Sequence, residues 1–415
     1  MCLVVVFAAL PFRRNLYESF LVFHIALVIL ALVGCWYHLV PHFGFDYGYQ
    51  VWLYISFAFW FADRLARFLR VAYYNRLGDS KAIVEVIPDS NIMQVTVFPR
   101  VAWGFGPAQH SFLYLPGLGN FWESHPFSVA AWKRQRQSLP TSPASAGATL
   151  SNSICKEANA KGSLAAASTT ELSSNPNSSA NKQQARPVQE TQGQDLAYIR
   201  FLIRAHSGIT SSLRRRLLSS PDGTQLELPV YTEGPYAGHR ATLQPLYVAD
   251  TVLCIAGGIG ITHILGIVQQ FATANVQEGE TNTRGRNIMK AKRFILAWSA
   301  REAALIEHVK LHFLADLEGV EYFFWCTNSP NTATKADPFD KEIQNRGGLG
   351  VGRTVAVTPG RMNIESILRA STEPGHQTAV IVCAPGGMAD EVTKQVVKCV
   401  RDGLRVDLVE ETFAW

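Results

Sequence analysis

An uncharged apolar stretch near the start of the chain limits the folds that this sequence can adopt. From Phe20 to Val40, 21 residues pass without an Asp, Glu, Lys or Arg. About 20 helical residues span a hydrocarbon layer of ~30 Å, so we expect a membrane-spanning helix here. A second stretch, Tyr47–Ala62, is rich in aromatic residues and needs part of Asp63–Tyr74 to complete a crossing. The short Pro41–Asp46 connection predicts an antiparallel helical hairpin.

Basic residues flank this hairpin on one side. Arg13 and Arg14 precede the first helix, and four arginines between Arg64 and Arg76 follow the second. The positive-inside rule makes that side cytoplasmic. The seven cysteines include no Cys-x-x-Cys pair, which favours a reducing compartment. We therefore expect a multi-pass membrane protein in contact with lipid, in the plasma membrane, with a cytoplasmic C-terminal part; a vacuolar membrane stays open.

Composition separates the rest of the chain into unlike parts. The net charge of +5, from 38 Lys+Arg and 33 Asp+Glu, is too small and scattered to predict nucleic-acid binding. Residues 138–194 are rich in Ser, Ala, Asn and Gln and contain no aromatic residue. Such a segment cannot bury enough apolar surface to offset its ordering entropy, so we expect a disordered surface insertion.

Two histidines lie within the first apolar stretch. His24 and His38 are 14 residues apart, which at ~100° per residue is about 40° short of four turns and places both on one helix face, ~21 Å apart. Neutral imidazole is an axial ligand for haem iron, so the spacing is compatible with two stacked haems. Interfacial histidines that hydrogen-bond to neighbouring helices would show the same spacing. His42 follows Pro41, and we expect it outside the helix.

Short strands with Gly and Pro between them predict an antiparallel barrel after the hairpin. The strands are expected at Ala82–Ile87, Gln94–Phe98, His110–Tyr114, Tyr198–Arg204 and Leu226–Thr232.

Two motifs of this barrel suit a flavin. In His125-Pro126-Phe127-Ser128, the aromatic ring can lie on a flavin face, the serine hydroxyl can reach its edge, and the histidine can donate to ribityl or phosphate oxygens. In Gly208-Ile209-Thr210, glycine admits a pyrophosphate, threonine adds a donor, and the amino end of a following helix favours an anion. A plain turn and an ordinary N-cap remain alternatives for the two motifs.

Strands alternating with helices predict a mostly parallel sheet in the last part of the chain. Strands are expected at Thr251–Ala256, Arg293–Trp298, Val320–Cys326 and Thr378–Cys383, and helices at His263–Ala272, Glu302–Leu317 and Ala389–Arg401.

The loop after the first of these strands is Gly-Gly-Ile-Gly-Ile-Thr, from Gly257 to Thr262. Its Gly257, Gly258 and Gly260, followed by a helix, suit a pyrophosphate, although a packing turn would look alike.

Three further residues are candidates at the ends of this sheet. Arg301 follows a strand where a 2′-phosphate favours arginine, so it indicates NADPH, although a solvated helix-start arginine stays open. Cys383 ends a strand and is expected to face the ligand crevice, with a buried structural thiol as the alternative. The terminal Trp415 could cover a flavin ring, or be a core or fraying residue.

Together these motifs resemble the fungal ferric reductase family, which is related to the NADPH oxidases. The resemblance runs from about Pro11 to Trp415 without the insertion. It rests on the helix with His24 and His38, Gly-Pro-Ala-Gln-His at 106–110, His-Pro-Phe-Ser at 125–128, Glu-Gly-Pro-Tyr at 233–236, Gly-Gly-Ile-Gly-Ile-Thr at 257–262, Cys-Ala-Pro-Gly-Gly-Met at 383–388 and the terminal Phe-Ala-Trp.

The resemblance implies a transmembrane α-helical segment followed by a ferredoxin–NADP reductase-like module, an antiparallel β-barrel plus an α/β parallel-sheet domain. The implied domains are a partial transmembrane haem domain (1–76), an FAD-binding barrel (77–240) and an NADPH-binding domain (241–415). Haem b would bind His24 and His38. Only one of the family's two histidine pairs is present, so the chain is expected to be truncated at its N-terminus.

The resemblance also assigns site residues and an activity. Catalytic roles fall to Ser128, Cys383 and Trp415, with Trp415 on the flavin face, and Glu233–Tyr236 joins the two cofactor domains. FAD contacts are implied at His125, Pro126, Phe127, Ser128, Gly208 and Thr210. NADPH contacts are implied at Gly257, Gly258, Gly260, Thr262, Cys383, Ala384, Pro385 and Gly386.

The expected reaction passes electrons from cytosolic NADPH through FAD and haem to a ferric chelate, as in iron uptake. A superoxide-generating NADPH oxidase and an incomplete, non-catalytic fragment are the alternatives, and the oligomeric state stays open.

Overall fold

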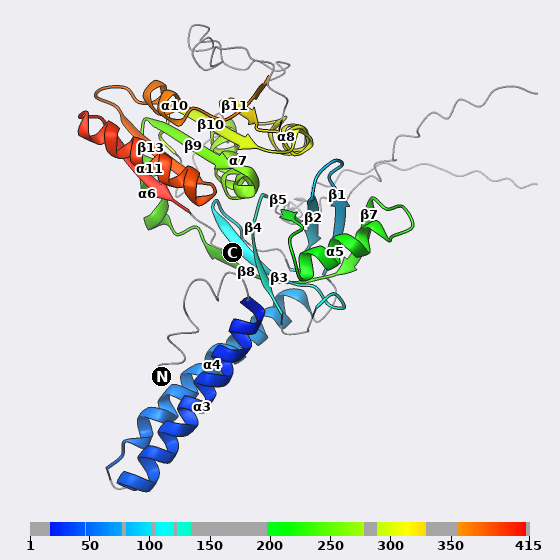
Figure 1. The fold of residues 1–415 in the computed structure, drawn as a ribbon, viewed down its shortest axis with the longest axis vertical. Coiled ribbons are helices and arrows are strands. Elements are labelled where there is room, and N and C mark those ends of the chain that lie inside the picture. Colours follow the sequence, from blue (N-terminus) through cyan, green and yellow to red (C-terminus); the bar gives the residue numbers. More distant parts are fainter. Residues whose placement is uncertain are drawn as a thin grey trace, which may run out of the picture. The chain divides into compact units, whose positions relative to one another are not determined.

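The computed structural model describes most of the chain (Figure 1). The described residues are 17–45, 47–76, 80–101, 104–119, 123–133, 197–277, 289–328 and 356–411. The insertion expected at 138–194 and the terminal Trp415 lie outside them.

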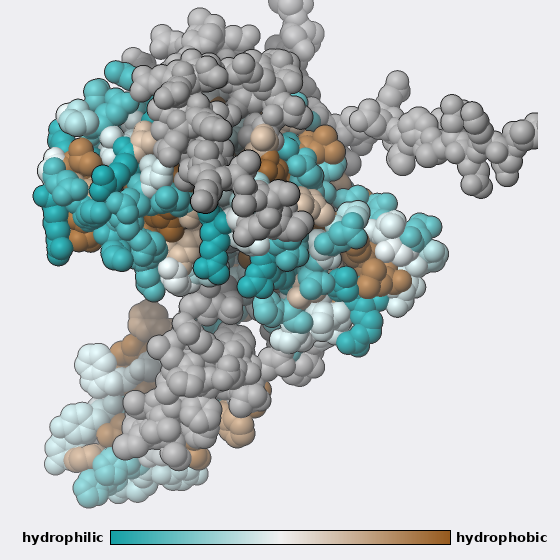
Figure 2. Space-filling view, turned by 45° about the horizontal axis from the view of Figure 1, so that its top comes forward, coloured by the Kyte–Doolittle hydropathy of each residue, from teal (hydrophilic) through white to brown (hydrophobic). Residues whose placement is uncertain are grey.

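Helices α3 (Tyr17–Phe43) and α4 (Gln50–Asn75) form the expected hairpin, and the rings of Trp36 and Tyr54 meet at 5.7 Å between them. Many large apolar side chains of both helices are exposed, and Figure 2 shows brown and pale surface on this part at lower left. Within the described residues, Val22–Phe43 is the one helical segment long and apolar enough to span a membrane. Helix α4, which contains Asp63 and several arginines, does not meet that criterion.

The end of α3 corrects one expectation. Pro41 lies inside the helix, which continues to Phe43, so His42 is helical and not a loop residue. Its ring stacks on that of His38, with 5.7 Å between the centroids and 11° between the planes. A proline mid-helix removes one hydrogen bond, but here only the last residues follow it, which limits the cost.

Two antiparallel sheets form the barrel part. The larger has the strand order β5-β6-β2-β1-β7, the smaller β4-β3-β8, and both face one apolar core that includes Val95, Phe201 and Leu113. The strands are β1 (Lys81–Val86), β2 (Ile92–Phe98), β3 (Gln109–Tyr114), β4 (His125–Ser128), β5 (Ala131–Lys133), β6 (Tyr198–Arg204), β7 (Gln225–Pro229) and β8 (Tyr231–Ala237), with helix α5 (Ile209–Leu218) between β6 and β7.

The strand expected over Leu226–Thr232 is two strands in the structure. β7 ends at Pro229 and pairs with β1, whereas β8 begins at Tyr231 and pairs with β3 in the other sheet. Proline has no N–H to donate, so it is tolerated at a strand end where the ladder stops. Apolar residues alternate without interruption through Pro229, so the alternation alone could not show that the chain passes from one sheet to the other there.

A six-stranded sheet forms the last part of the chain, with the order β12-β11-β10-β9-β13-β14 and all neighbours parallel. Its strands are β9 (Thr251–Gly257), β10 (Arg293–Ala300), β11 (Glu321–Cys326), β12 (Val357–Pro359), β13 (Gln377–Cys383) and β14 (Arg405–Glu410). The helices and turns are α6 (Arg240–Val248), η1 (Gly258–Gly260), α7 (Ile261–Gln277), α8 (Ala303–Val309), η2 (Lys310–Leu314), α10 (Ile364–Ser371) and α11 (Gly386–Arg401).

The helix expected over Glu302–Leu317 is shorter and changes form, because α8 passes into the π-helical turn η2. Strand β9 lies fully buried between β10 and β13. From β9 the chain runs outward through β10, β11 and β12 on one side and returns to β13 and β14 on the other. The order therefore reverses between β9 and β13, which is where open parallel sheets bind ligands.

Candidate functional site

The loops that follow β9 and β13 lie side by side at the reversal of strand order. In the register of the two strands Cys383 pairs with Ala256, so both strands end at the same level. The segments Gly257–Thr262 and Cys383–Met388 follow directly, and we call the place where they meet the nucleotide crevice. The family resemblance implies NADPH contacts at Gly257, Gly258, Gly260 and Thr262 and from Cys383 to Gly386, and the structure places these two stretches side by side.

Two glycines make this close approach possible. A Cβ on Gly260 would lie 2.1 Å from the carbonyl oxygen of Cys383, far inside van der Waals contact. A Cβ on Gly257 would lie 2.6 Å from Cδ of Pro385 and 2.9 Å from Cβ of Ala384. The glycines thus hold the two loops against each other, which is a packing role as well as a route for a bound phosphate to approach the backbone.

Gly258 is required for a different reason. It has a φ of 55°, in the left-handed region that favours glycine, and a Cβ there would meet only the tip of Arg204 at 4.0 Å. The indole N–H of Trp298, on β10, donates to its carbonyl oxygen at 2.9 Å. The hydroxyl of Thr262 donates to the carbonyl of Ile259 at 2.9 Å. These bonds give the loop a defined shape.

Cys383 lies at the base of the crevice and is 2% exposed. Burial, with a smaller contribution from Glu411, raises the pKa of its thiol to about 12. At neutral pH the group is therefore a neutral thiol, which is a weak hydrogen-bond donor. Its predicted catalytic role would be contact with the nicotinamide, not attack as a thiolate.

Arg301 follows β10, whose Trp298 pairs with Ala256 on β9. The residue is exposed at the carboxyl edge of the sheet. Its neighbour Glu302 accepts from Arg204 of β6 at 3.2 Å. This ion pair joins the sheet edge to the barrel.

The predicted flavin residues form strand β4. His125, Pro126, Phe127 and Ser128 pair with Leu113 to His110 of β3, and all four are half-buried. Ser128 lies opposite His110, for which burial lowers the imidazole pKa, so that ring is neutral at pH 7. The strand thus presents an aromatic ring, a hydroxyl and a histidine within a few residues, a set that fits a flavin.

The second flavin motif begins α5. Gly208 precedes the helix with a φ of 61°, and no side chain of the described residues caps its amino end. The first amides are thus left for an anion such as a pyrophosphate, so the arrangement fits FAD. The hydroxyl of Thr210 accepts from the His206 amide at 3.0 Å and donates to the Ser207 carbonyl at 3.1 Å. Thr210 thus shapes the turn as well as adding a polar group.

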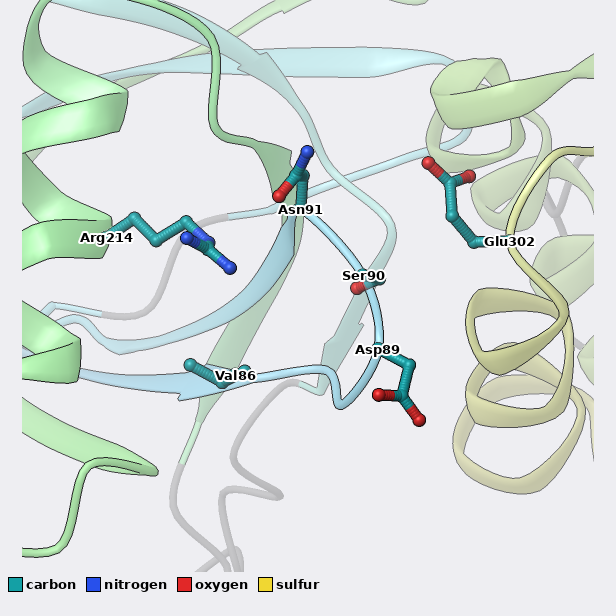
Figure 3. Close-up of a pocket in the computed structure, with 6 residues that line it drawn as sticks. All are labelled: Val86, Asp89, Ser90, Asn91, Arg214 and Glu302. Carbon is teal, nitrogen blue, oxygen red and sulfur yellow. The ribbon is translucent and has the colours of Figure 1, made fainter.

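A pocket of about 390 Å³ lies beside these elements (Figure 3). Arg214 points into it from α5 and Glu302 from the opposite side, with the β1–β2 turn between them. Its described lining is Val86, Asp89, Ser90, Asn91, Arg214 and Glu302. None of these residues belongs to β4 or to the nucleotide crevice, so the pocket is separate from the predicted contacts.

The buried carboxylate of Glu233 on β8 is a feature that sequence reasoning missed. It is 0% exposed and accepts from Arg67 of α4 through Oε1 at 2.8 Å and Oε2 at 3.0 Å. The hydroxyl of Tyr114 donates to it at 2.7 Å, and that of Tyr236 also donates. Burial alone would raise the pKa of this carboxyl, but the hydrogen bonds from Arg67, Tyr236 and Tyr114 hold it below its usual range.

The predicted haem ligands lie on α3, and the described residues offer no facing pair. His24 is half-buried, and His38 is exposed and stacked on His42. Helix α4 contains no histidine, and the described residues contain no cluster of three or more metal-ligating side chains. Bis-histidine coordination therefore does not fit the described residues alone.

Comparisons with protein families identify both cofactor domains. The ferric reductase NAD-binding domain family matches residues 249–397, which include the nucleotide crevice. An FAD-binding domain family matches residues 76–140, which include β4.

Curated relatives are similar over nearly the whole chain. The chain is 24% identical to ferric reductase transmembrane component 3 of Saccharomyces cerevisiae, over 100% of this chain and 50% of the relative. It is 22% identical to ferric/cupric reductase transmembrane component 2 of that yeast, over 99% of this chain and 49% of the relative. The chain thus spans about half the length of these curated relatives. A ferredoxin NADP⁺ reductase from Neisseria gonorrhoeae with bound FAD and NADP aligns with a TM-score of 0.44 and 11% identity, over 80% of this chain and 97% of that one.

Proposed function

We propose that this chain, a member of the ferric reductase family by its FAD- and NAD-binding domains, moves electrons from a reduced pyridine nucleotide through FAD to a ferric chelate. One NADPH carries two electrons, so it reduces two ferric ions to ferrous ions and leaves NADP⁺ and one proton. The adjacency of Gly257–Thr262 and Cys383–Met388 at the reversal of strand order carries the proposal.

The chain's own part is binding and orientation, because the bound flavin supplies the hydride and single-electron chemistry. The amides of the Gly257–Gly260 loop and the start of α7 would hold the pyrophosphate of the nucleotide. The neutral thiol of Cys383, which lies beside Gly260, would pack on the nicotinamide. Strand β4 and the amino end of α5 would hold the flavin ring and its pyrophosphate.

The experiment is ferric-chelate reduction by membranes that contain the full-length protein. We expect NADPH-dependent formation of ferrous ion, in a ratio of two ferrous ions to one nucleotide. Nucleotide oxidation with superoxide as the main product would instead support the oxidase alternative. No nucleotide oxidation, with flavin bound, would overturn the proposal.

We propose NADPH as the physiological donor on the basis of Arg301. Arg301 follows β10 at the carboxyl edge of the sheet, where a 2′-phosphate would bind, and its guanidinium would pair with that group bidentately. In Arg301→Ala we expect the KM for NADPH to rise about tenfold, by the loss of ~1.4 kcal/mol, while the KM for NADH stays unchanged. Lys292→Ala is the matched control, since Lys292 is exposed at the opposite end of the same strand. Equal changes for both nucleotides would contradict the assignment.

The membrane location is also a proposal. The segment Val22–Phe43, the exposed apolar side chains of both hairpin helices and the transmembrane relatives support a site in lipid, for which we propose the plasma membrane. Haem b on His24 and His38 would need further histidines from outside the described residues. A reduced-minus-oxidised spectrum of His24→Ala and His38→Ala membranes tests it, with loss of six-coordinate haem expected.

A further inference from the structure

The carboxyl-terminal end of α4 is joined to strand β8 by buried polar contacts. Asn75, 1% exposed, donates to the carbonyl of Thr232 at 2.9 Å, and its side-chain oxygen accepts from the Thr232 amide at 2.9 Å. Two turns earlier on the helix, Arg67 binds Glu233 through two hydrogen bonds. We call these four residues the α4–β8 junction.

Cation–π contacts extend the junction to a second strand. The guanidinium of Arg67 lies 5.7 Å from the ring centroid of Phe112 on β3. That of Arg70 lies 5.6 Å from the ring centroid of Tyr236 on β8. Such contacts are attractive because the negative face of the aromatic ring meets the positive guanidinium. Side chains of helix α4 therefore contact β8 and β3, two of the three strands of the small sheet.

The same sheet carries the predicted flavin residues. On β3, Phe112 pairs with Glu233 of β8 on one side and with Pro126 of β4 on the other. Neighbouring strands lie about 4.8 Å apart, so Glu233 and Pro126 are separated by about 10 Å of hydrogen-bonded sheet. Because a sheet of paired strands is stiff across this distance, β8 and β4 keep a fixed separation. A displacement of α4 relative to β8 therefore changes the distance between α4 and β4.

We propose that Arg67 is a positioning residue for electron transfer. Held on the buried carboxylate of Glu233, it keeps the hairpin at a constant distance from the flavin strand β4. This role rests on the proposed function, because single-electron transfer falls steeply with donor–acceptor distance, whereas hydride transfer at the nucleotide crevice does not involve α4. Loss of Arg67 should therefore separate the two half-reactions.

The test compares Arg67→Met with Arg64→Met in the full-length protein in membranes. Arg64 is the matched control, because it lies one turn away on the same helix and pairs with Asp63 at a position where both side chains are more than half exposed. Three measurements are made: bleaching of the flavin by NADPH, reduction of a soluble dye by the flavin, and reduction of a ferric chelate. We expect Arg67→Met to keep the first two rates and to lower the third at least tenfold. Arg67→Lys should restore part of it, and Arg64→Met should leave all three unchanged.

Hydrogen exchange at the amides of β8 provides a readout that needs no activity. In Arg67→Met and in Glu233→Gln we expect faster exchange over Tyr231–Ala237 than in wild type, and no change in Arg64→Met. The double variant should exchange no faster than either single one, because both remove the same pair. Ferric-chelate reduction by Arg67→Met at the wild-type rate, or unchanged exchange, would overturn the positioning role. A wild-type protein that bleaches its flavin but reduces no chelate would overturn the proposed function alone.

Discussion

The nucleotide crevice and the α4–β8 junction are built by opposite means. In the crevice, missing side chains matter, since Gly257 and Gly260 let two loops approach each other within contact distance. At the junction, long polar side chains matter, since Arg67 and Asn75 reach partners more than 150 positions along the chain. We therefore expect added side-chain atoms to disrupt the crevice, and removed side-chain atoms to disrupt the junction.

This difference follows from what each place has to do. A crevice for a pyrophosphate needs bare backbone amides, so its specificity lies in local conformation. A junction between a hairpin and a sheet needs directional bonds between surfaces that meet only after folding. Arginine suits it because its planar guanidinium binds a carboxylate through two parallel bonds. The two regions should therefore respond to substitution in contrasting ways.

Gly260→Ala should have the largest effect. The new Cβ would lie 2.1 Å from the carbonyl oxygen of Cys383, which is backbone and cannot rotate away. A displacement of the loop by about 1 Å can lower a reaction rate about 100-fold, and we expect that loss in flavin reduction by NADPH, measured by stopped flow. Gly104→Ala is the control, because Gly104 lies outside the crevice and a Cβ there meets nothing within 4 Å. A Gly260→Ala protein with the wild-type rate would show that the crevice tolerates added atoms.

Asn75→Ala should destabilise the junction. The change leaves the N–H and C=O of Thr232 without their reciprocal partner in a buried place, at a cost of about 2 kcal/mol. Thermal unfolding of the full-length protein in detergent measures it, with Ser56→Ala as the control. The Ser56 hydroxyl is exposed and bonds only to Trp52 within the same helix at 2.8 Å. Equal shifts of the unfolding temperature in the two variants would show that the hydrogen bonds of the junction add no more stability than an exposed hydrogen bond within a helix.

Trp298→Phe tests the crevice by removing one bond without adding an atom. The indole N–H donates to Gly258 at 2.9 Å, and its loss should cost about 1 kcal/mol and raise the KM for the nucleotide about fivefold. The ring of Phe still fills most of the space against Phe324. Steady-state kinetics measures the KM, and an unchanged value would mean that the glycine conformation holds without this bond.

The smallest expected effect is on the pH dependence of the junction. The folded pKa of Glu233 is lowered, so its contribution to stability is complete above the unfolded pKa of about 4.3 and is lost as the pH falls through the folded value. Wild-type stability should thus fall more steeply below pH ~4 than that of Glu233→Gln, which cannot titrate. Denaturant unfolding between pH 3 and 6 is the measurement, and parallel curves would contradict the contribution of the ionised carboxylate.

Much of the fold could be predicted from local patterns. Strand β6 begins and ends at the expected residues, Tyr198 and Arg204, because alternation and flanking polar residues mark both ends. The strand over Leu226–Thr232 was predicted wrongly, since alternation continues through Pro229 while the chain changes sheet. The prediction that His42 lies in a loop is wrong, because a proline near the last turn costs a helix little and Pro41 does not end α3.

Part of the candidate site was likewise predicted from local patterns, and part was not. The Gly257–Thr262 loop was predicted to bind a pyrophosphate, because a glycine-rich turn between a buried strand and a helix can be recognised locally. The contacts from Cys383 to Gly386 were predicted only through the family resemblance. The resemblance implies that the Glu-Gly-Pro-Tyr segment at 233–236 joins the two cofactor domains, and the structure adds that its carboxylate pairs with the hairpin, which the sequence did not predict. Four arginines follow the second apolar stretch, and nothing in their spacing distinguishes Arg67 from Arg64.

By itself the sequence determined the class of each part: an apolar hairpin, an antiparallel barrel and a parallel nucleotide domain. Periodicity, the placement of glycines and the absence of charge are local features of a few neighbouring residues, so they can be recognised without knowledge of the tertiary structure. Only the tertiary structure decided which arginine meets a buried carboxylate and which glycines touch a second loop. Those contacts join residues 123 to 166 positions apart, and their partners are defined only once β8, β9 and β13 have taken their places.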